Sequence, residues 1–209
     1  MLRFPQHDAV LGYTGAHLPV SSSPQQAGKL LVTATSLAGL LLLEPKVFGD
    51  ERGFFLESYN RQEMALAGIT AEFVQDNHSH SARGVLRGLH YQIQQPQGKL
   101  VRVVQGEIFD VAVDLRRQSP TCGQWFGASL SAENKRMLWI PAGFAHGFVV
   151  TAESADVLYK ATDFYAPQFE ITLAWNDPAI GIDWPLDGEA IVSARDRQGL
   201  SLAQAPKLD

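Results

Sequence analysis

The sequence predicts an all-β domain, either a sandwich or a barrel, on two observations. From residue 38 onward, short apolar or aromatic runs recur roughly every 8 to 15 residues between clusters of Gly, Pro, Asn and Asp, which is typical of short strands joined by turns. The composition also fits a globular protein, because 45% of the 209 residues are hydrophobic and 19% are charged. Disordered and collagen-like chains are therefore excluded.

The clearest strand is FDVAVDL (109–115), in which large apolar side chains alternate with Asp and Ala. This period of two is expected when one face of a strand is buried. The full set of expected strands is Leu41–Glu44, Phe54–Tyr59, Val85–Tyr91, Leu100–Val104, Ile108–Leu115, Trp125–Leu130, Arg136–Ile140, Gly147–Val150 and Asp156–Ala161.

Helix is expected at few places. One short helix fits Arg61–Ala67 and ends at Gly68, because glycine favours the left-handed conformation that closes a helix. A second short helix is expected near the C-terminus. The apolar run Leu30–Leu43 contains Thr and Ser and is shorter than the ~20 residues that cross a bilayer, so it is predicted to belong to the core.

Residues 1–29 are expected to form a polar N-terminal extension ahead of a single domain over residues 30–209. The extension includes the loop-like run SSSPQQAG. It lacks the apolar core of a secretory signal and the multiple Arg of a transit peptide. Because the single cysteine, Cys122, cannot form an internal disulfide, a cytoplasmic location is expected.

The charge of the chain limits its partners. A net charge of −5 does not supply the basic face that a duplex nucleic-acid binder needs to neutralise phosphates. We therefore expect neither nucleic acid nor membrane as a partner. Any anionic ligand must be held by a few local Arg or Lys side chains.

The segment Ile140–Gly147 reads P-x-G-x-x-H, a tight turn that delivers His146 into the next strand. This spacing resembles the second motif of the cupin jelly roll. In metal-binding cupins the first motif supplies H-x-H, since a divalent metal needs several converging N or O donors. The corresponding strand here has His90 followed by Gln92, so the metal cage is incomplete and no metal is expected.

A different H-x-H occurs at His78-Ser79-His80. Two His separated by one residue would share a strand face and could ligate zinc. The segment is rich in Asn, Ser, Gly and Arg, however, and is expected to be a loop without a neighbouring carboxylate at fixed spacing. Because a metal site needs further ligands and a supporting shell, the loop interpretation is favoured.

Seven motifs, in order and with natural spacing from about residue 31 to about residue 202, resemble the dTDP-4-dehydrorhamnose 3,5-epimerase family. They are PKVFGDERGFFLESYN (45–60), FVQDNHS (73–79), GVLRGLHYQ (84–92), QGKLVRVVQGEIFDVAVDLRRQSPT (97–121), LSAENKRMLWIPAGFAHGFVV (130–150), LYKATDFY (158–165) and AWNDPAIGIDWP (174–185).

The resemblance implies a cupin-type jelly roll that forms a homodimer and uses no metal or organic cofactor. The implied reaction inverts carbons 3 and 5 of a nucleotide-diphosphate 4-keto-6-deoxyhexose in dTDP-L-rhamnose synthesis. Both carbons lie alpha to the carbon 4 ketone, so a base can remove either proton to give an enolate and an acid can return it on the opposite face. The protein must then supply a base, an acid and donors for the enolate oxygen.

By position in the family motifs, the base would be His90 of RGLHYQ, and Asp196 of SARD would orient its imidazole. Imidazole is the side chain whose unperturbed pKa, about 6.5, lies nearest the operating pH. Lys99 of PQGKL would stabilise the enolate, and Tyr159 of LYKAT would be the acid. Each has a structural alternative: a core histidine, a helix carboxylate, a solvated lysine and a packing tyrosine.

The resemblance also implies a set of substrate ligands. Guanidinium forks suit phosphate, and Arg195 stands where relatives are expected to have Lys. Which of the ligands contact thymine stays open. The set is Arg52, Glu57, Gln75, Asn77, Arg87, His146, Tyr165, Glu170 and Arg195.

Two alternative functions compete with the 3,5-epimerase. One is an epimerase that inverts only carbon 3 or carbon 5 of a related nucleotide keto-deoxysugar, which substitutions at His90 or Tyr159 would indicate. The other is a non-catalytic cupin binding module. A binding module has no need for a base, an acid and an enolate cation together, so their coincidence favours an enzyme.

Overall fold

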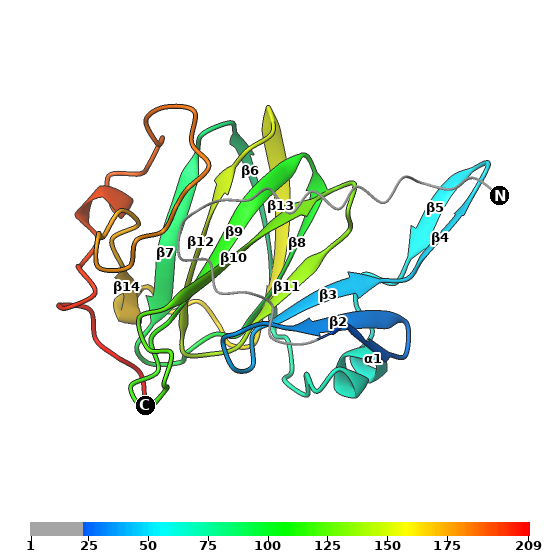
Figure 1. The fold of residues 1–209 in the computed structure, drawn as a ribbon, viewed down its shortest axis with the longest axis horizontal. Helices are drawn as coiled ribbons and strands as arrows, with labels where there is room; N and C mark the ends of the chain where they lie inside the picture. The colour runs from blue at the N-terminus through cyan, green and yellow to red at the C-terminus, as the bar shows by residue number, and fades with distance from the viewer. Residues whose placement is uncertain (1–22) are drawn as a thin grey trace.

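The computed structural model describes residues 23–209, and Figure 1 shows two antiparallel sheets that face each other. The seven-stranded sheet has the order β1-β2-β3-β11-β8-β13-β6, and the five-stranded sheet has the order β10-β9-β12-β7-β14. Strands β4 and β5 form a separate hairpin that projects from the body of the molecule (Figure 1). The all-β jelly-roll prediction is confirmed.

The bounds of the elements follow chain order. They are β1 (Gln25–Ala27), β2 (Leu30–Ala34), β3 (Leu41–Pro45), β4 (Val47–Asp50), β5 (Gly53–Leu56), α1 (Arg61–Leu66), β6 (Gln75–Ala82), β7 (Leu86–Gln92), β8 (Lys99–Gln105), β9 (Glu107–Asp114), β10 (Trp125–Ser131), β11 (Met137–Ile140), β12 (Phe144–Val150), β13 (Ser154–Ala161), β14 (Glu170–Thr172) and two 3₁₀ turns, η1 (Pro167–Phe169) and η2 (Asp196–Gln198).

The main core lies between the two sheets, where side chains such as Val101, Phe126 and Phe148 are buried. A second core lies on the outer face of the five-stranded sheet, because the C-terminal segment packs there (Figure 1). Strand β9 is consequently buried on both faces, which corrects the one-face interpretation of FDVAVDL. Phe109 packs edge-on against Trp184 of the C-terminal segment, while Asp110 is fully buried.

The apolar run Leu30–Leu43 is core, as predicted. It forms β2 and β3, which pack with α1 in a third cluster through Met64. Helix α1 begins where the Asn60 side chain accepts hydrogen bonds from the first-turn backbone. It ends before Gly68, whose φ of +82° is the left-handed conformation that glycine tolerates. This helix was predicted correctly.

Three segments differ from the sequence expectation. Residues 25–27 lie inside the expected N-terminal extension but form β1, paired with β2. The NHSHS segment belongs to β6 and pairs along its whole length with β13, so it is a strand rather than a loop. The short helix expected near the C-terminus is the single 3₁₀ turn η2. None of the helices within residues 23–209 is long and apolar enough to span a membrane.

Candidate active site

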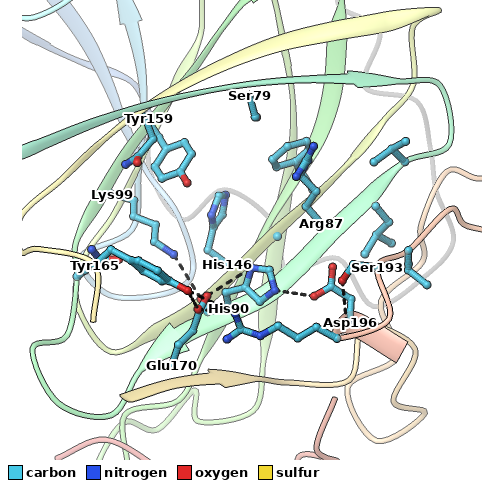
Figure 2. A pocket seen from close by; sticks show the side chains of 18 of the residues that line it. Ser79, Arg87, His90, Lys99, His146, Tyr159, Tyr165, Glu170, Ser193 and Asp196 are labelled. Atoms are coloured by element: carbon cyan, nitrogen blue, oxygen red, sulfur yellow. Dashed lines mark hydrogen bonds and ion pairs between the residues drawn. The ribbon is translucent and has the colours of Figure 1, made fainter. Parts of the chain in front are cut away.

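A cavity of about 700 Å³ opens between the two sheets and holds most of the predicted site residues (Figure 2). The seven-stranded sheet contributes from β6, β8 and β13, and the five-stranded sheet contributes from β7, β12 and β14. The polar and aromatic side chains that line it are Gln75, Asn77, Ser79, Arg87, His90, Gln97, Lys99, His146, Phe148, Tyr159, Tyr165, Glu170, Ser193, Arg195 and Asp196.

His90 and Asp196 form a hydrogen-bonded pair at one side of the cavity. His90 Nε2 lies 2.6 Å from Asp196 Oδ1, and the carboxylate is almost fully buried. Burial opposes ionisation of Asp196, but the hydrogen bond and charge of His90, with a contribution from Ser193, hold the pKa of that carboxyl below its usual value. The arrangement fixes the imidazole and leaves its Nδ1 edge for the cavity, 4.0 Å from Glu170 Oε1.

The two cavity histidines stand side by side, because His90 on β7 and His146 on β12 are cross-strand partners. Next to them the strands approach so closely that a Cβ added to Gly88 would lie 2.6 Å from Gly147 Cα. Glycine at both positions permits this approach, and Gly88 also has a φ of +118°. The RGLH and AHG motifs therefore place both imidazoles on the same wall of the cavity.

Lys99 is a buried cation at the start of β8. Its Nζ donates to the carbonyl oxygen of His90 at 3.4 Å, and its side chain is only 8% exposed. Burial lowers the pKa of the ammonium to about 8, while the charges of Glu170 and Asp110 oppose that shift. A fixed cation of this kind stabilises negative charge that develops on a bound ligand.

Tyr159 enters the cavity from β13, in the opposite sheet to His90 (Figure 2). Burial raises the pKa of its phenol, and the charge of Glu170 adds to this, whereas Arg87 acts in the other direction. The hydroxyl therefore stays protonated at neutral pH. The cavity thus has a proton acceptor on one wall and a proton donor on the other.

Glu170, Tyr165 and Arg195 form a connected group at the cavity rim. Tyr165 Oη donates to Glu170 Oε2 at 2.6 Å, and Arg195 Nη1 lies 2.7 Å from the same oxygen. Tyr165 is half exposed, so its ring is accessible to a ligand. These three residues, predicted separately as substrate ligands, lie together.

Gln75, Asn77 and Arg87 complete the predicted ligands that line the cavity. Gln75 Oε1 accepts from the backbone N–H of Tyr165 at 2.9 Å, and its amide donates to Asn77. Arg87 Nε donates to Ser81 Oγ at 2.9 Å. Its Nη2 donates to the carbonyl oxygen of His80 at 3.4 Å, and the positive charge of the guanidinium suits an anionic group of a ligand.

Two predicted ligands do not reach this cavity within one chain. Arg52 lies at the tip of the β4–β5 hairpin, where its guanidinium is 85% exposed and pairs with Asp50. Glu57 follows the hairpin and pairs with Lys29 at 2.7 Å. The structure therefore separates these two side chains from the other seven.

The structure describes both places where the sequence raised a metal site, the cupin position of Gln92 and the pair His78 and His80. Gln92 binds backbone groups on both sides, accepting from the N–H of Ala166 and donating to the carbonyl of Gln95. His78 and His80 both lie beside the Asp156 carboxylate, at 2.8 and 3.2 Å, so the absence of a neighbouring carboxylate was a wrong expectation. Within residues 23–209, no group of three or more His, Cys, Asp or Glu is arranged to hold a metal ion.

Sequence reasoning missed one buried residue beside the cavity floor, Asp110. Its Oδ1 lies 2.7 Å from His146 Nε2. The residue was hidden because period-two alternation assigns it to a polar outer face, while β9 has no exposed face. The cue was its position in a strand that also carries Asp114, since two carboxylates on one buried strand both require partners.

Comparisons with known proteins identify the family of the chain. The family model for dTDP-4-dehydrorhamnose 3,5-epimerase matches residues 34–204. An epimerase of that name from Pseudomonas aeruginosa is 63% identical over 174 residues, which is 83% of this chain and 96% of that protein.

Two solved structures are informative. A dTDP-6-deoxy-D-glucose-3,5-epimerase from Legionella pneumophila, in complex with dTDP-4-keto-L-rhamnose, is 53% identical with a TM-score of 0.81, covering 83% of this chain and 93% of that one. A 3′-monoepimerase from Streptomyces bikiniensis, in complex with dTDP-quinovose, is 34% identical with a TM-score of 0.76, covering 81% and 86%. With these relatives and the family model, the chain belongs to the dTDP-4-dehydrorhamnose 3,5-epimerase family, and it is an isomerase of the epimerase class.

Proposed function

We propose that this chain inverts carbons 3 and 5 of dTDP-4-dehydro-6-deoxy-D-glucose to give dTDP-4-dehydro-L-rhamnose. One observation carries the proposal: a His–carboxylate pair and a half-buried tyrosine face one cavity from opposite sheets, and a buried ammonium lines the same cavity. Inversion at a carbon requires removal of a proton from one face and its return to the other. Two facing sheets supply that arrangement directly.

His90 is the base. Neutral imidazole can accept a proton near neutral pH, and the Asp196 carboxylate 2.6 Å from Nε2 stabilises the imidazolium that forms. The proton leaves carbon 3 or carbon 5, and the electron pair moves into the ring to make the enolate at the carbon 4 oxygen. Lys99 stabilises this oxyanion as a fixed ammonium.

Tyr159 is the acid. Its raised pKa makes it a weak acid in water, but the enolate carbon is strongly basic and accepts the phenolic proton. The proton arrives from the β13 side, opposite the face from which His90 removed the first. Bulk solvent then returns His90 and Tyr159 to their starting states.

The diphosphate and the nucleoside lie towards the cavity rim in this proposal. Arg87 and Arg195 provide guanidinium groups at the cavity wall and rim, which suit phosphate oxygens. The half-exposed ring of Tyr165 offers a surface for stacking. Gln75 and Asn77 supply amides for hydrogen bonds to the ligand.

The active form is a homodimer in which the β4–β5 hairpin of one chain reaches the cavity of its partner. The hairpin exposes Phe54 and Phe55 at 61% and 64%, and it carries Arg52 away from the cavity of its own chain. Exposed apolar clusters of this kind mark interaction surfaces. A partner cavity also gives Arg52 and Glu57 the substrate contact that their motif implies.

The reaction needs no metal or organic cofactor, because the ketone itself accepts the electron pair. The substrate is a nucleotide sugar, so the proposed location is the cytoplasm, and neither nucleic acid nor membrane is a partner. Single-carbon epimerisation, the activity named for the Streptomyces relative, is the alternative. Identity of 34% to that protein against 63% to a 3,5-epimerase favours double inversion, and the presence of both His90 and Tyr159 favours an enzyme over a binding module.

The test is the identity of the product. Purified protein is incubated with dTDP-4-keto-6-deoxyglucose, and the ketone is reduced chemically so that the configuration at each carbon is fixed. The proposal expects sugars inverted at both carbons, measured by proton coupling constants. A product inverted at carbon 3 or carbon 5 alone supports the single-carbon alternative, and unchanged substrate refutes both.

A further inference from the structure

Asp110 on β9 is a fully buried carboxylate with an incomplete set of partners. Its Oδ1 pairs with His146 Nε2 at 2.7 Å, whereas its Oδ2 is buried without a hydrogen-bond partner. A buried polar atom left unpaired costs about 1 to 3 kcal/mol, and a charged one costs more. A carboxylate in this position therefore requires a nearby positive charge.

The pair formed by Asp110 and His146 is the second His–carboxylate pair of the cavity. His146 is the cross-strand partner of His90, so the two imidazoles project from the same face of the sheet. Each imidazole is hydrogen-bonded to a carboxylate. With Nε2 held by Asp110, the Nδ1 edge of His146 is left to face the cavity. Asp110 thus fixes the orientation of the ring as Asp196 does for His90.

Lys99 is a buried cation beside this pair, because its Nζ donates to the carbonyl oxygen of His90, the cross-strand partner of His146. Within residues 23–209, the charged carboxylates that act on the Lys99 ammonium are Glu170 and Asp110. Glu170 is already engaged by Arg195 and by the hydroxyl of Tyr165. The other titratable groups that line the cavity around Lys99 are His90, His146, Tyr159, Tyr165, Arg87 and Asp196.

We propose that Asp110 is a positioning residue for the reaction: its carboxylate orients His146 towards the cavity and keeps Lys99 in the ammonium form that the enolate oxygen needs. The proposal rests on the proposed function, because it assigns Lys99 to the enolate. Asp110 does not line the cavity and acts through these two neighbours.

The proposal predicts how the pH profile changes. Burial lowers the pKa of Lys99 to about 8, and the charge of Asp110 opposes that shift. Asp110→Asn keeps an oxygen that can accept from His146 but removes the charge, so Lys99 loses its proton at lower pH. A neighbouring opposite charge moves a pKa by about 1 unit or more, so the alkaline limb of kcat/KM should move to lower pH by about that amount.

The experiment measures kcat/KM from pH 6 to 9.5 for wild type and three variants. Asp110→Asn should lose at least about fivefold more activity at pH 8.5 than at pH 6.5, as a one-unit shift requires. His146→Asn keeps the Asp110 charge and offers it an amide donor, so its alkaline limb should stay at the wild-type pH although its rate falls. Glu72→Gln removes an exposed carboxylate paired with Arg61 and serves as the charge control.

A second readout does not depend on turnover. The Lys99 ammonium is titrated by ¹⁵N NMR, with its signal assigned by loss in Lys99→Arg, and its pKa should fall in Asp110→Asn. Should Asp110→Asn not fold, as judged by circular dichroism, Asp110→Ser provides the same loss of charge with room for a water. This readout separates failure of the present proposal from failure of the proposed function.

Three results overturn the proposal. If the alkaline limb and the pKa of Lys99 both stay at the wild-type values in Asp110→Asn, Asp110 does not control the charge of the Lys99 ammonium. If the alkaline limb of kcat/KM moves in His146→Asn by as much as in Asp110→Asn, the shift reflects a general disturbance of the residues around His146. If kcat/KM of Asp110→Asn falls by the same factor at every pH, the role of the Asp110 carboxylate is purely structural.

Discussion

Lys99 carries a charge that the proposed reaction needs and that destabilises the folded protein. Its ammonium is buried, and its pKa falls to about 8 from a usual value near 10.5. Because the unfolded chain binds this proton more tightly, keeping Lys99 charged in the folded state costs about 3 kcal/mol at neutral pH. The proposed enolate and the buried Asp110 carboxylate both use that charge.

Replacement of Lys99 by Met should therefore inactivate the protein and remove this pH-dependent term from its stability. At pH 7 turnover should fall at least about 100-fold, because an oxyanion donor is lost. Between pH 8 and about 10.5 the wild type regains this stability as Lys99 loses its proton in the folded state. Urea unfolding at pH 7 and pH 10 measures the stability of the wild type relative to the Met variant, which should rise by about 2 to 3 kcal/mol between the two pH values. A difference that does not change with pH contradicts the lowered pKa of Lys99.

At the scale of the element, the cavity depends on how closely β7 and β12 approach. Gly88 and Gly147 lie opposite each other beside the two cavity histidines. A side chain at either glycine would meet backbone atoms rather than the flexible end of a side chain. The strands would then separate, and both imidazoles would move.

Gly88→Ala should destabilise the fold by about 2 kcal/mol or more, because its Cβ would lie 2.7 Å from the His146 carbonyl oxygen at a φ of +118°. Epimerase activity should fall with it. Gly84→Ala is the matched control, since Gly84 also has a positive φ but has open space around its Cβ, and only the cost of the left-handed conformation, about 1 to 2 kcal/mol, is expected. Thermal unfolding compares the two, and equal losses contradict the close-approach argument.

The β4–β5 hairpin is the element proposed to join two chains. Phe54→Ser with Phe55→Ser should leave the body folded and convert the dimer to monomer, since apolar contact area is lost. Leu66→Ser, which changes an equally exposed residue on α1, is the control and should remain dimeric. Sedimentation velocity measures the mass, and a double variant that is still dimeric rules out the hairpin as the interface.

The elements also show what sequence could predict. Helix α1 was found because its cap residues Asn60 and Gly68 act locally. Strand β6 was taken for a loop because both of its faces are polar: Asn77 faces the cavity and His78 faces Asp156. An alternating hydrophobic pattern arises only when one face of a strand is apolar and the other is polar, and β6 lacks this contrast in hydrophobicity. The irregular C-terminal segment, which covers the five-stranded sheet, likewise carries little periodic signal.

At the scale of the whole molecule, both sheets contribute side chains to the cavity. The five-stranded sheet carries His90 and His146, and the seven-stranded sheet carries Lys99 and Tyr159. Residues more than 100 positions apart, such as His90 and Asp196, are joined only by folding. The family motifs placed these residues in the site, but the partnership of Asp110 with His146 could be seen only in the structure.

The whole site is expected to work without metal. Gln92 is fully engaged with backbone groups, so it leaves the cupin H-x-H position without a ligand. Dialysis against EDTA should leave turnover unchanged, and elemental analysis should find less than one equivalent of transition metal per chain. Activity that is lost to the chelator and restored by one divalent ion contradicts this expectation.

The central claim is that His90 and Tyr159 act from opposite sheets as base and acid, and deuterium exchange tests it most directly. Proton NMR follows exchange at carbons 3 and 5 of dTDP-4-keto-6-deoxyglucose in deuterium oxide, with wild type, His90→Ala and Tyr159→Phe. The account predicts no exchange in His90→Ala, because no enolate forms without the base. Tyr159→Phe should still exchange but give little inverted product, with an effect of about 100-fold or more. Exchange at the wild-type rate in His90→Ala, or inversion at the wild-type rate in Tyr159→Phe, would contradict it.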